Sequence, residues 1–519
     1  MLIDNKKYLT LFIIIFLNVS NGSFSDEDYS IENLTNNDME IILNKIIFSH
    51  IYKYNNVPKI KYNNEQSLDF FSNNKNLSVN PIIGIRFSSS GFELNPLINP
   101  EETLWLTPGI KFRYRNTLIS PYSGILFNIW GAFYKHSAYF LKKSIFNKES
   151  LKNENLKPFQ YNPYISMEYF VKTEKPEWGI DFDEAQGGIF ISSRNLDIYF
   201  GKFKSSFGPF LRGNLSISHN TPSFPQFRLD YIHSFNNQKK IDFTYLIGDL
   251  ISEIEDSTVL TAYQNSEIIK QSRLPWIKRG IIYHRVDLHI TQSLRVGFYE
   301  LVIFGARQTP WQYLIPINFY WSAQHATGDF DNLQMGFDLD YIHNNGRTNF
   351  AILVDEWAPY KTFSSNHHNW FGFQFGRTQF FDIYKQKFYF RIENTIIMPQ
   401  IYEHKFPINS VFNHGYPIGF WTGGDAFDTW ITIKSFGNKF LPRFELEYTV
   451  FGSPKYQISR KYLSVNDKFR LKYSLVFDYK LKSFSKIELC FSHFETKKID
   501  NNKQNYFSLN LSFKYNISY

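Results

Sequence analysis

The last fifteen residues of the chain, NYFSLNLSFKYNISY, alternate apolar and polar side chains without a break. A period of two places successive side chains on opposite faces of a β-strand. Chain ends are usually frayed and polar, so a terminal strand with one large apolar face must be held by a neighbouring strand. The apolar positions are Phe507, Leu509, Leu511, Phe513, Tyr515, Ile517 and Tyr519.

The same alternation recurs along most of the chain. It is clearest at 468–480, and it returns at 110–115, 241–248, 284–290, 333–341, 387–393 and 443–450. About 18 such segments share the roughly 440 residues from Pro81 onward, which gives about 24 residues per strand and connection, close to a tilted membrane strand with its turn or loop. At 468–480 one face is expected to carry Phe469, Leu471, Tyr473, Leu475, Phe477 and Tyr479, and the other mostly charged or hydroxyl side chains.

The aromatic content favours a membrane wall over a soluble sandwich, in which the apolar faces would pack on a second sheet. Phe, Tyr and Trp make up 19% of the residues, more than one core usually needs. In lipid every backbone polar group must be paired within the protein, so a sheet has to close. We predict an all-β fold, a single outer-membrane β-barrel of about 18 transmembrane strands at 81–519. Its last strand pairs with its first, Tyr519 lies at a membrane interface and the polar faces line the lumen.

The N-terminal end is typical of a secretory signal peptide. Lys6 and Lys7 precede an apolar run at 9–19 and then small residues, a run about half the length that a membrane-spanning helix needs. We expect residues 1–25 to be removed and the protein to reach the bacterial outer membrane. Residues 26–80 are predicted to hold a short helix around 39–47, in either a mobile linker or a periplasmic or plug segment at the barrel mouth.

The residue types exclude several chemistries. Cys490 is the only cysteine, so neither an internal disulfide nor a thiolate metal cage is available. The sequence lacks a GxxxxGK loop, a GxSxG elbow and an HExxH pair, and its 13 histidines are scattered. We therefore expect no catalytic activity, no metal and no cofactor. The net charge of +8 points to acidic glycans or lipid head groups, with a coding bias toward Lys as the alternative.

The stretch 295–331 combines aromatic rings with acidic, amide and basic side chains, the combination that sugar recognition needs. The alternative is a lumen network in which Glu300 and Arg307 pair to tie an inward-folded loop to the wall. VDEWAP at 354–359 is a second candidate, or an aromatic girdle residue beside solvated carboxylates. The candidate residues from these two stretches are Glu300, Arg307, Gln324, His325, Asp329, Asp331, Asp355, Glu356 and Trp357.

Three motifs in order resemble the Wzi family of capsule-assembly outer-membrane proteins. They are FGPFLRGNLSISHNTPSFPQFRL at 207–229, the stretch from Glu300 to His325 followed by GDFDNLQMGFDLDY, and HGYPIGFWTGGDAFD at 414–428. Phe207 stands where the family tends to have Trp, and Thr221 and Ser223 replace its usual Ala and Gly. The resemblance implies a large barrel with a mostly obstructed lumen that acts as a surface lectin.

We predict an outer-membrane barrel that binds exported capsular or extracellular polysaccharide and helps to attach or assemble it at the cell surface. The expected partners are that polysaccharide and the lipid and lipopolysaccharide of the outer membrane, without nucleic acid, for a monomeric protein. A passive porin or sugar and anion channel would share every barrel feature and remains the alternative. To the sugar-binding candidates above, the first motif adds Arg212, Asn214 and Asn220.

Overall fold

The computed structural model describes residues 53–55, 77–89, 102–117, 126–142, 169–170, 179–193, 195–236, 239–255, 276–291, 293–326, 328–343, 346–361, 369–384, 386–436, 440–452, 468–482, 485–497 and 503–516. The expected signal peptide, the helix around 39–47 and Tyr519 lie outside these residues. Within them, no helix is long and apolar enough to cross a membrane.

One antiparallel sheet closes on itself, and eighteen of the described strands form the ring. In order around the ring they are β2 (Leu77–Ser88), β3 (Thr103–Thr117), β4 (Leu126–Phe140), β6 (Gly179–Ser192), β7 (Leu196–Phe203), β9 (Phe224–Asn236), β10 (Lys239–Glu255), β11 (Trp276–His289), β12 (Leu294–Gly305), β13 (Asn332–His343), β14 (Gly346–Glu356), β15 (Trp370–Ile383), β16 (Gln386–Ile397), β19 (Ala426–Phe436), β20 (Phe440–Phe451), β21 (Lys468–Lys482), β22 (Ser485–Lys497) and β23 (Lys503–Asn516).

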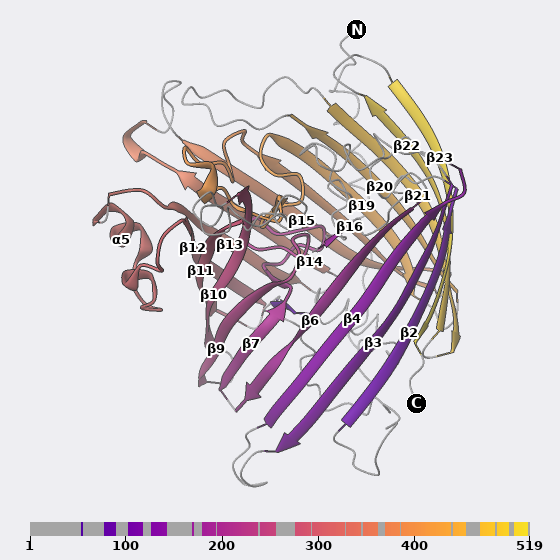
Figure 1. Ribbon diagram of the computed structural model, residues 1–519. Helices are drawn as coiled ribbons and strands as arrows, with labels where there is room; N and C mark the ends of the chain where they lie inside the picture. The colour runs from indigo at the N-terminus through magenta and orange to yellow at the C-terminus, as the bar shows by residue number, and fades with distance from the viewer. Residues whose placement is uncertain are drawn as a thin grey trace, which may run out of the picture.

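Pairing between the first and last strands of the ring closes the barrel. β2 runs antiparallel to β23 from Ile82, opposite Asn516, to Ser88, opposite Asn510. Figure 1 shows indigo β2 beside yellow β23, with the remaining strands following the colour order around the wall. This pairing explains the alternation at the chain end and confirms the predicted barrel.

A few short elements lie outside the ring. β1 (Lys53–Asn55) pairs with β8 (Ser205–Phe207), β5 (Tyr169–Phe170) extends the edge of β6, and β17 (Phe412–Asn413) pairs with β18 (Tyr416–Pro417). The described helices are α5 (Tyr320–Ala326) and three single 3₁₀ turns, η5 (Trp311–Tyr313), η6 (Pro359–Lys361) and η7 (Pro407–Asn409).

The two faces of the wall differ as the alternation predicts. Along β21, Tyr473 and Leu475 are exposed on the outside, whereas Arg470, Ser474 and Asp478 are buried toward the lumen. In a membrane the outward apolar side chains contact lipid without a free-energy penalty, whereas the inward charged side chains pair with side chains of nearby strands. Arg285 of β11 and Arg295 of β12, for example, both pair with Asp338 of β13.

The connections mark the two ends of the barrel. At one end the strands are joined by short turns such as 344–345 and 483–484, and at the other by long stretches such as 256–275 and 452–467. Outer-membrane barrels place short turns in the periplasm and long loops outside the cell. The loops that follow β7, β12, β14 and β16 therefore belong to the extracellular end.

Candidate functional site

The loop between β7 and β9, residues 204–223, runs into the lumen and is held there by a buried arginine. Arg212 Nε lies 3.0 Å from a carboxylate oxygen of Asp428 on β19, and its Nη1 lies 3.0 Å from Glu447 on β20. The backbone N–H groups of Leu211 and Arg212 donate to Glu393 of β16 at 2.8 and 2.9 Å. Each of these charged side chains is almost fully buried.

This loop spans the lumen from one wall to the opposite wall. Around the ring, the seven strands β10, β11, β12, β13, β14, β15 and β16 separate β9 from β19. In the other direction the seven strands β6, β4, β3, β2, β23, β22 and β21 separate β7 from β20. Because both paths are equally long, the Arg212 ion pairs join diametrically opposite parts of the wall.

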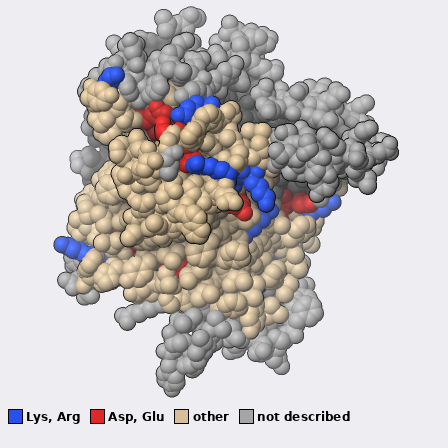
Figure 2. All heavy atoms as spheres, turned by 60° about the vertical axis from the view of Figure 1, so that its left-hand side comes forward, with Lys and Arg blue, Asp and Glu red and all other residues tan. Residues whose placement is uncertain are grey.

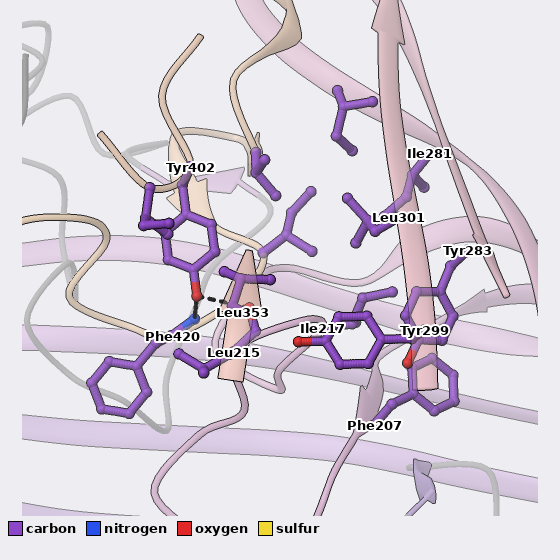
Figure 3. Close-up of a cluster of buried hydrophobic side chains, with 14 of the residues drawn as sticks. Phe207, Leu215, Ile217, Ile281, Tyr283, Tyr299, Leu301, Leu353, Tyr402 and Phe420 are labelled. Carbon is purple, nitrogen blue, oxygen red and sulfur yellow. Dashed lines mark hydrogen bonds between the residues drawn. The ribbon is translucent and has the colours of Figure 1, made fainter. Parts of the chain in front are cut away.

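A second inward loop, 398–425 between β16 and β19, crosses in the reverse direction. Asn413 Oδ1 accepts from the backbone N–H of Ile251 on β10 at 3.0 Å, and Asn413 Nδ2 donates to the Pro222 carbonyl of the first loop at 3.2 Å. The Tyr402 hydroxyl donates to the Leu215 carbonyl at 2.7 Å and accepts from the Phe420 N–H at 3.0 Å (Figure 3). The two loops are thus hydrogen-bonded to each other and to the wall.

Apolar packing completes this arrangement, which we call the lumen plug (204–223 and 398–425). Its side chains form one buried cluster with the lumen faces of β10–β12 and β14–β16. Phe207 stacks on Tyr283 of β11 with ring centroids 4.9 Å apart, whereas Leu215 and Phe420 lie beside Tyr402 on the other side of the same cluster (Figure 3). An apolar interior of this kind excludes water from the part of the lumen that the plug occupies.

The candidates in the first motif belong to the plug. Asn214 accepts from the Phe210 N–H at 3.1 Å and donates to the Ser206 hydroxyl at 2.9 Å, and Asn220 donates to the Pro417 carbonyl at 2.6 Å. Like Arg212, both amides are buried. Asn214 fixes the conformation of the first loop and Asn220 bonds it to the second loop, and neither amide offers an exposed surface to a sugar.

The stretch 306–331, which we call the outer-wall segment, lies on the outside of the barrel and not in the lumen. Leu301 and Ile303 of β12 point to the plug, whereas Val302, on the opposite face, packs against Tyr313 and Tyr320 of the segment. Figure 1 shows α5 standing outside the strands on the side of β10–β12. The expectation of an inward-folded loop at this position is wrong.

The expected pairing of Glu300 with Arg307 is also wrong. Glu300 lies on the outer face of β12, where it bonds His284 Nε2 at 2.8 Å and accepts from the N–H groups of Tyr320 and Trp321 at 2.9 and 3.1 Å. It therefore satisfies the first donors of α5. Arg307 pairs instead with Asp331.

The remaining candidates of this segment divide into buried and exposed groups. Gln324 is buried and donates to the Asp331 carbonyl at 2.6 Å, and the Tyr313 hydroxyl donates to the Asp331 carboxylate at 3.0 Å. Burial raises the pKa of Asp331, and the Arg307 and Tyr313 contacts partly offset this. His325 and Asp329 are exposed, and Asp329 lies 3.7 Å from Lys405 of the second inward loop.

Two extracellular loops, the outer-wall segment and the second inward loop, meet at the rim above β12–β16. Phe330 stacks on Phe406 with centroids 6.0 Å apart, and its carbonyl accepts from Asn409 at 2.7 Å. Asp355, at the end of β14, accepts from Gln334 at 2.9 Å and from the Tyr402 N–H at 3.1 Å. Asp355 thus links the ends of β13 and β14 to the second inward loop.

The loop after β14 exposes the largest flat surfaces of the rim. Trp357 is 51% exposed and Tyr360 is 82% exposed, with the Lys361 ammonium 5.4 Å from the Tyr360 ring. Asn369 fixes the loop from both sides, because it accepts from the Ala358 N–H at 2.8 Å and donates to the Lys361 carbonyl at 2.7 Å. Glu356, beside Trp357, is partly exposed at the same edge.

We call the exposed part of this region the rim cluster, which consists of Asp329, Phe330, Trp357, Tyr360, Lys361, Lys405 and Phe406. Two of these residues, Asp329 and Trp357, were sequence candidates. The others were missed, although the aromatic and basic pairs in PYK at 359–361 and HKF at 404–406 carry the same signal.

Two ionisable groups of the second inward loop have shifted pKa values at this rim. Burial raises the pKa of Glu403 to about 7, which a hydrogen bond from Ser410 partly offsets. Burial lowers the pKa of His404 to about 4. Among the described residues, no group of three or more His, Cys, Asp or Glu side chains is placed to hold a metal ion.

Comparison with known proteins finds similarity in the fold only. No family model and no curated protein matches the sequence. Among solved structures, the chain is similar to Wzi of Escherichia coli, with 12% sequence identity and a TM-score of 0.51 over 85% of this chain and 84% of that one. Wzi is described as an outer-membrane protein involved in group 1 capsule assembly and as a carbohydrate-binding β-barrel. OccAB4 of Acinetobacter baumannii is 8% identical with a TM-score of 0.43, over 85% of this chain and 98% of its own. The chain thus has the fold of an outer-membrane β-barrel.

Proposed function

We propose that this protein binds exported polysaccharide at the extracellular rim of the barrel and helps to attach or assemble it at the cell surface, without catalysis. The observation that carries the proposal is the lumen plug, whose Arg212 links opposite walls through Asp428 and Glu447. A diffusion channel needs an open aqueous path. A barrel whose loops are packed inward is better suited to present a fixed surface.

The rim cluster has the chemistry that an acidic polysaccharide requires. The exposed rings of Trp357 and Tyr360 can stack on the apolar C–H faces of sugars. Lys361 lies beside the Tyr360 ring and Lys405 beside the Phe406 ring, and both ammonium groups can attract carboxylates or phosphates. The carbohydrate-binding description of the structurally similar Wzi agrees with this choice.

Binding of the polysaccharide purified from the same cells tests the proposal. The double variant Trp357→Ala/Tyr360→Ala removes two exposed rings from the rim, and we expect at least a tenfold loss of affinity, since ring stacking typically contributes about 1 kcal/mol or more per ring. Tyr384→Ala is the matched control, because Tyr384 is fully exposed in the short turn between β15 and β16 at the periplasmic end. Equal affinities for the double variant and the control would overturn the assignment of the rim.

Incubation of the same polysaccharide with the protein tests the absence of catalysis. We expect its size distribution to stay unchanged over the time in which binding reaches equilibrium. A shift to shorter or longer chains that depends on the protein would instead show an enzyme.

A further inference from the structure

The outer-wall segment combines two features that a soluble loop does not need. It packs on the outside of the barrel, and its free side carries large apolar side chains. Trp311 is 82% exposed and Ile317 is 86% exposed, and Ile315, Phe319 and Trp321 are also exposed. In water this surface would be costly, at about 25 cal/mol for each Å² of apolar area.

The segment is folded back along the wall and does not extend away from the rim. Glu300, which binds the first N–H groups of α5, lies five residues before Gly305 at the end of β12, or about 17 Å along the strand. Two residues further toward the periplasm, on the same outer face, Phe298 is 48% exposed. The exposed apolar surface of the segment is therefore continuous with the lipid-facing belt of the barrel.

The outer face of the barrel beneath the segment carries polar groups that the segment covers. Most outward positions are apolar, but His284 and Glu300 form a polar pair on the outer face of β11 and β12. His284 Nδ1 also lies 2.9 Å from the Pro316 carbonyl, and the Tyr245 hydroxyl donates to the Leu314 carbonyl at 3.4 Å. The segment thus gives these groups further partners and covers a polar pair that would otherwise face hydrocarbon with part of its hydrogen-bonding capacity unmet.

The view of this side agrees with a lipid contact. In Figure 2 most of the described surface is neither basic nor acidic, and the charged side chains gather in a band across its upper half. Trp and other aromatic residues concentrate at the boundary between head groups and acyl chains, because one part of each ring system is apolar and another can meet water.

We propose that the outer-wall segment is a lateral membrane anchor, whose Trp311, Ile315, Ile317, Phe319 and Trp321 enter the boundary between head groups and acyl chains of the outer leaflet. The molecules that contact this segment are membrane lipids, and the segment adds apolar contact area outside the ring of strands. The proposal goes beyond polysaccharide binding, because it depends only on the membrane location of the barrel and not on any glycan.

Site-directed spin labelling tests the anchor in the full chain reconstituted into phosphatidylcholine vesicles. In a Cys490→Ser background, nitroxide labels are attached to Ile317→Cys and, independently, to Trp311→Cys. Phe298→Cys provides the lipid-exposed reference and Tyr360→Cys the water-exposed one. A difference in gel mobility between unheated and heated samples verifies that each labelled barrel is folded.

The readout is the ratio of collision rates with oxygen, which concentrates in the bilayer, and with a water-soluble nickel chelate. We expect labels at 317 and 311 to show a ratio several-fold above that at 360 and close to that at 298. A ratio equal to that at 360 would place the segment in water and overturn the proposal. Shielding of the labels from both reagents, together with cross-linked dimers, would show that a second copy of the chain covers the segment, and this result would also overturn the proposal.

Discussion

Replacing Arg212 with alanine should release the lumen plug from the wall. The substitution leaves Asp428 without its 3.0 Å partner and removes one cation from Glu447, both in buried positions. Glu447 keeps Lys472 at 3.0 Å and Arg470 at 3.6 Å, so we take the low end of the usual cost of breaking a buried ion pair, about 3 kcal/mol. At 1.36 kcal/mol per factor of ten, the undocked population should rise by about two orders of magnitude.

Single-channel recording in planar bilayers measures this population directly. We expect the wild-type barrel to give a closed trace with rare openings and Arg212→Ala to open about 100 times as often. Arg443→Ala is the matched control, because Arg443 on β20 forms its ion pair with Glu445 of the same strand, at 3.1 Å, and not with the plug.

Two results would refute the reasoning. If Arg212→Ala and Arg443→Ala gave the same conductance as the wild type, the ion pairs of Arg212 would not hold the plug. A large steady current from the wild-type protein itself would show an open path through the lumen and would favour the porin alternative.

Three further substitutions test the loops separately. Tyr402→Phe leaves the Leu215 carbonyl and the Phe420 N–H without this hydroxyl, and should lower the free energy of unfolding in detergent by about 1–3 kcal/mol. An unchanged free energy of unfolding would mean that these two hydrogen bonds do not stabilise the plug. Glu403 binds a proton more tightly in the folded state, with a pKa of about 7 against 4.5, so wild-type stability should fall by up to about 3 kcal/mol as pH rises from 4.5 to above 7. Glu403→Gln should remove this slope, and an equal slope in both proteins would contradict the shift. Glu300→Ala removes the acceptor of two α5 N–H groups and should speed proteolytic cleavage within 306–331 about tenfold or more, whereas an unchanged rate would mean that another contact holds the segment.

The sequence alone was enough to predict the barrel. Alternation of period two is a local property that each strand carries in its own residues, as in 468–480, where Tyr473 and Leu475 face out and Arg470 and Asp478 face in. In lipid, a sheet must close on itself so that the backbone groups at every strand edge are paired, and the pairing of β2 with β23 meets that requirement.

The roles of the candidate residues were decided by the tertiary structure. Arg212 and Asn220 lie in one loop whose sequence shows no period, and their partners Asp428 and Pro417 lie about two hundred residues away, so no local pattern could reveal that this loop crosses the lumen. Glu300 was predicted to belong either to a sugar site or to a lumen network, but its position on β12 places it on the outer face, where α5 covers it. The alternation of side chains along a strand determines which face of the sheet a residue occupies, whereas only the tertiary structure determines which groups that face contacts.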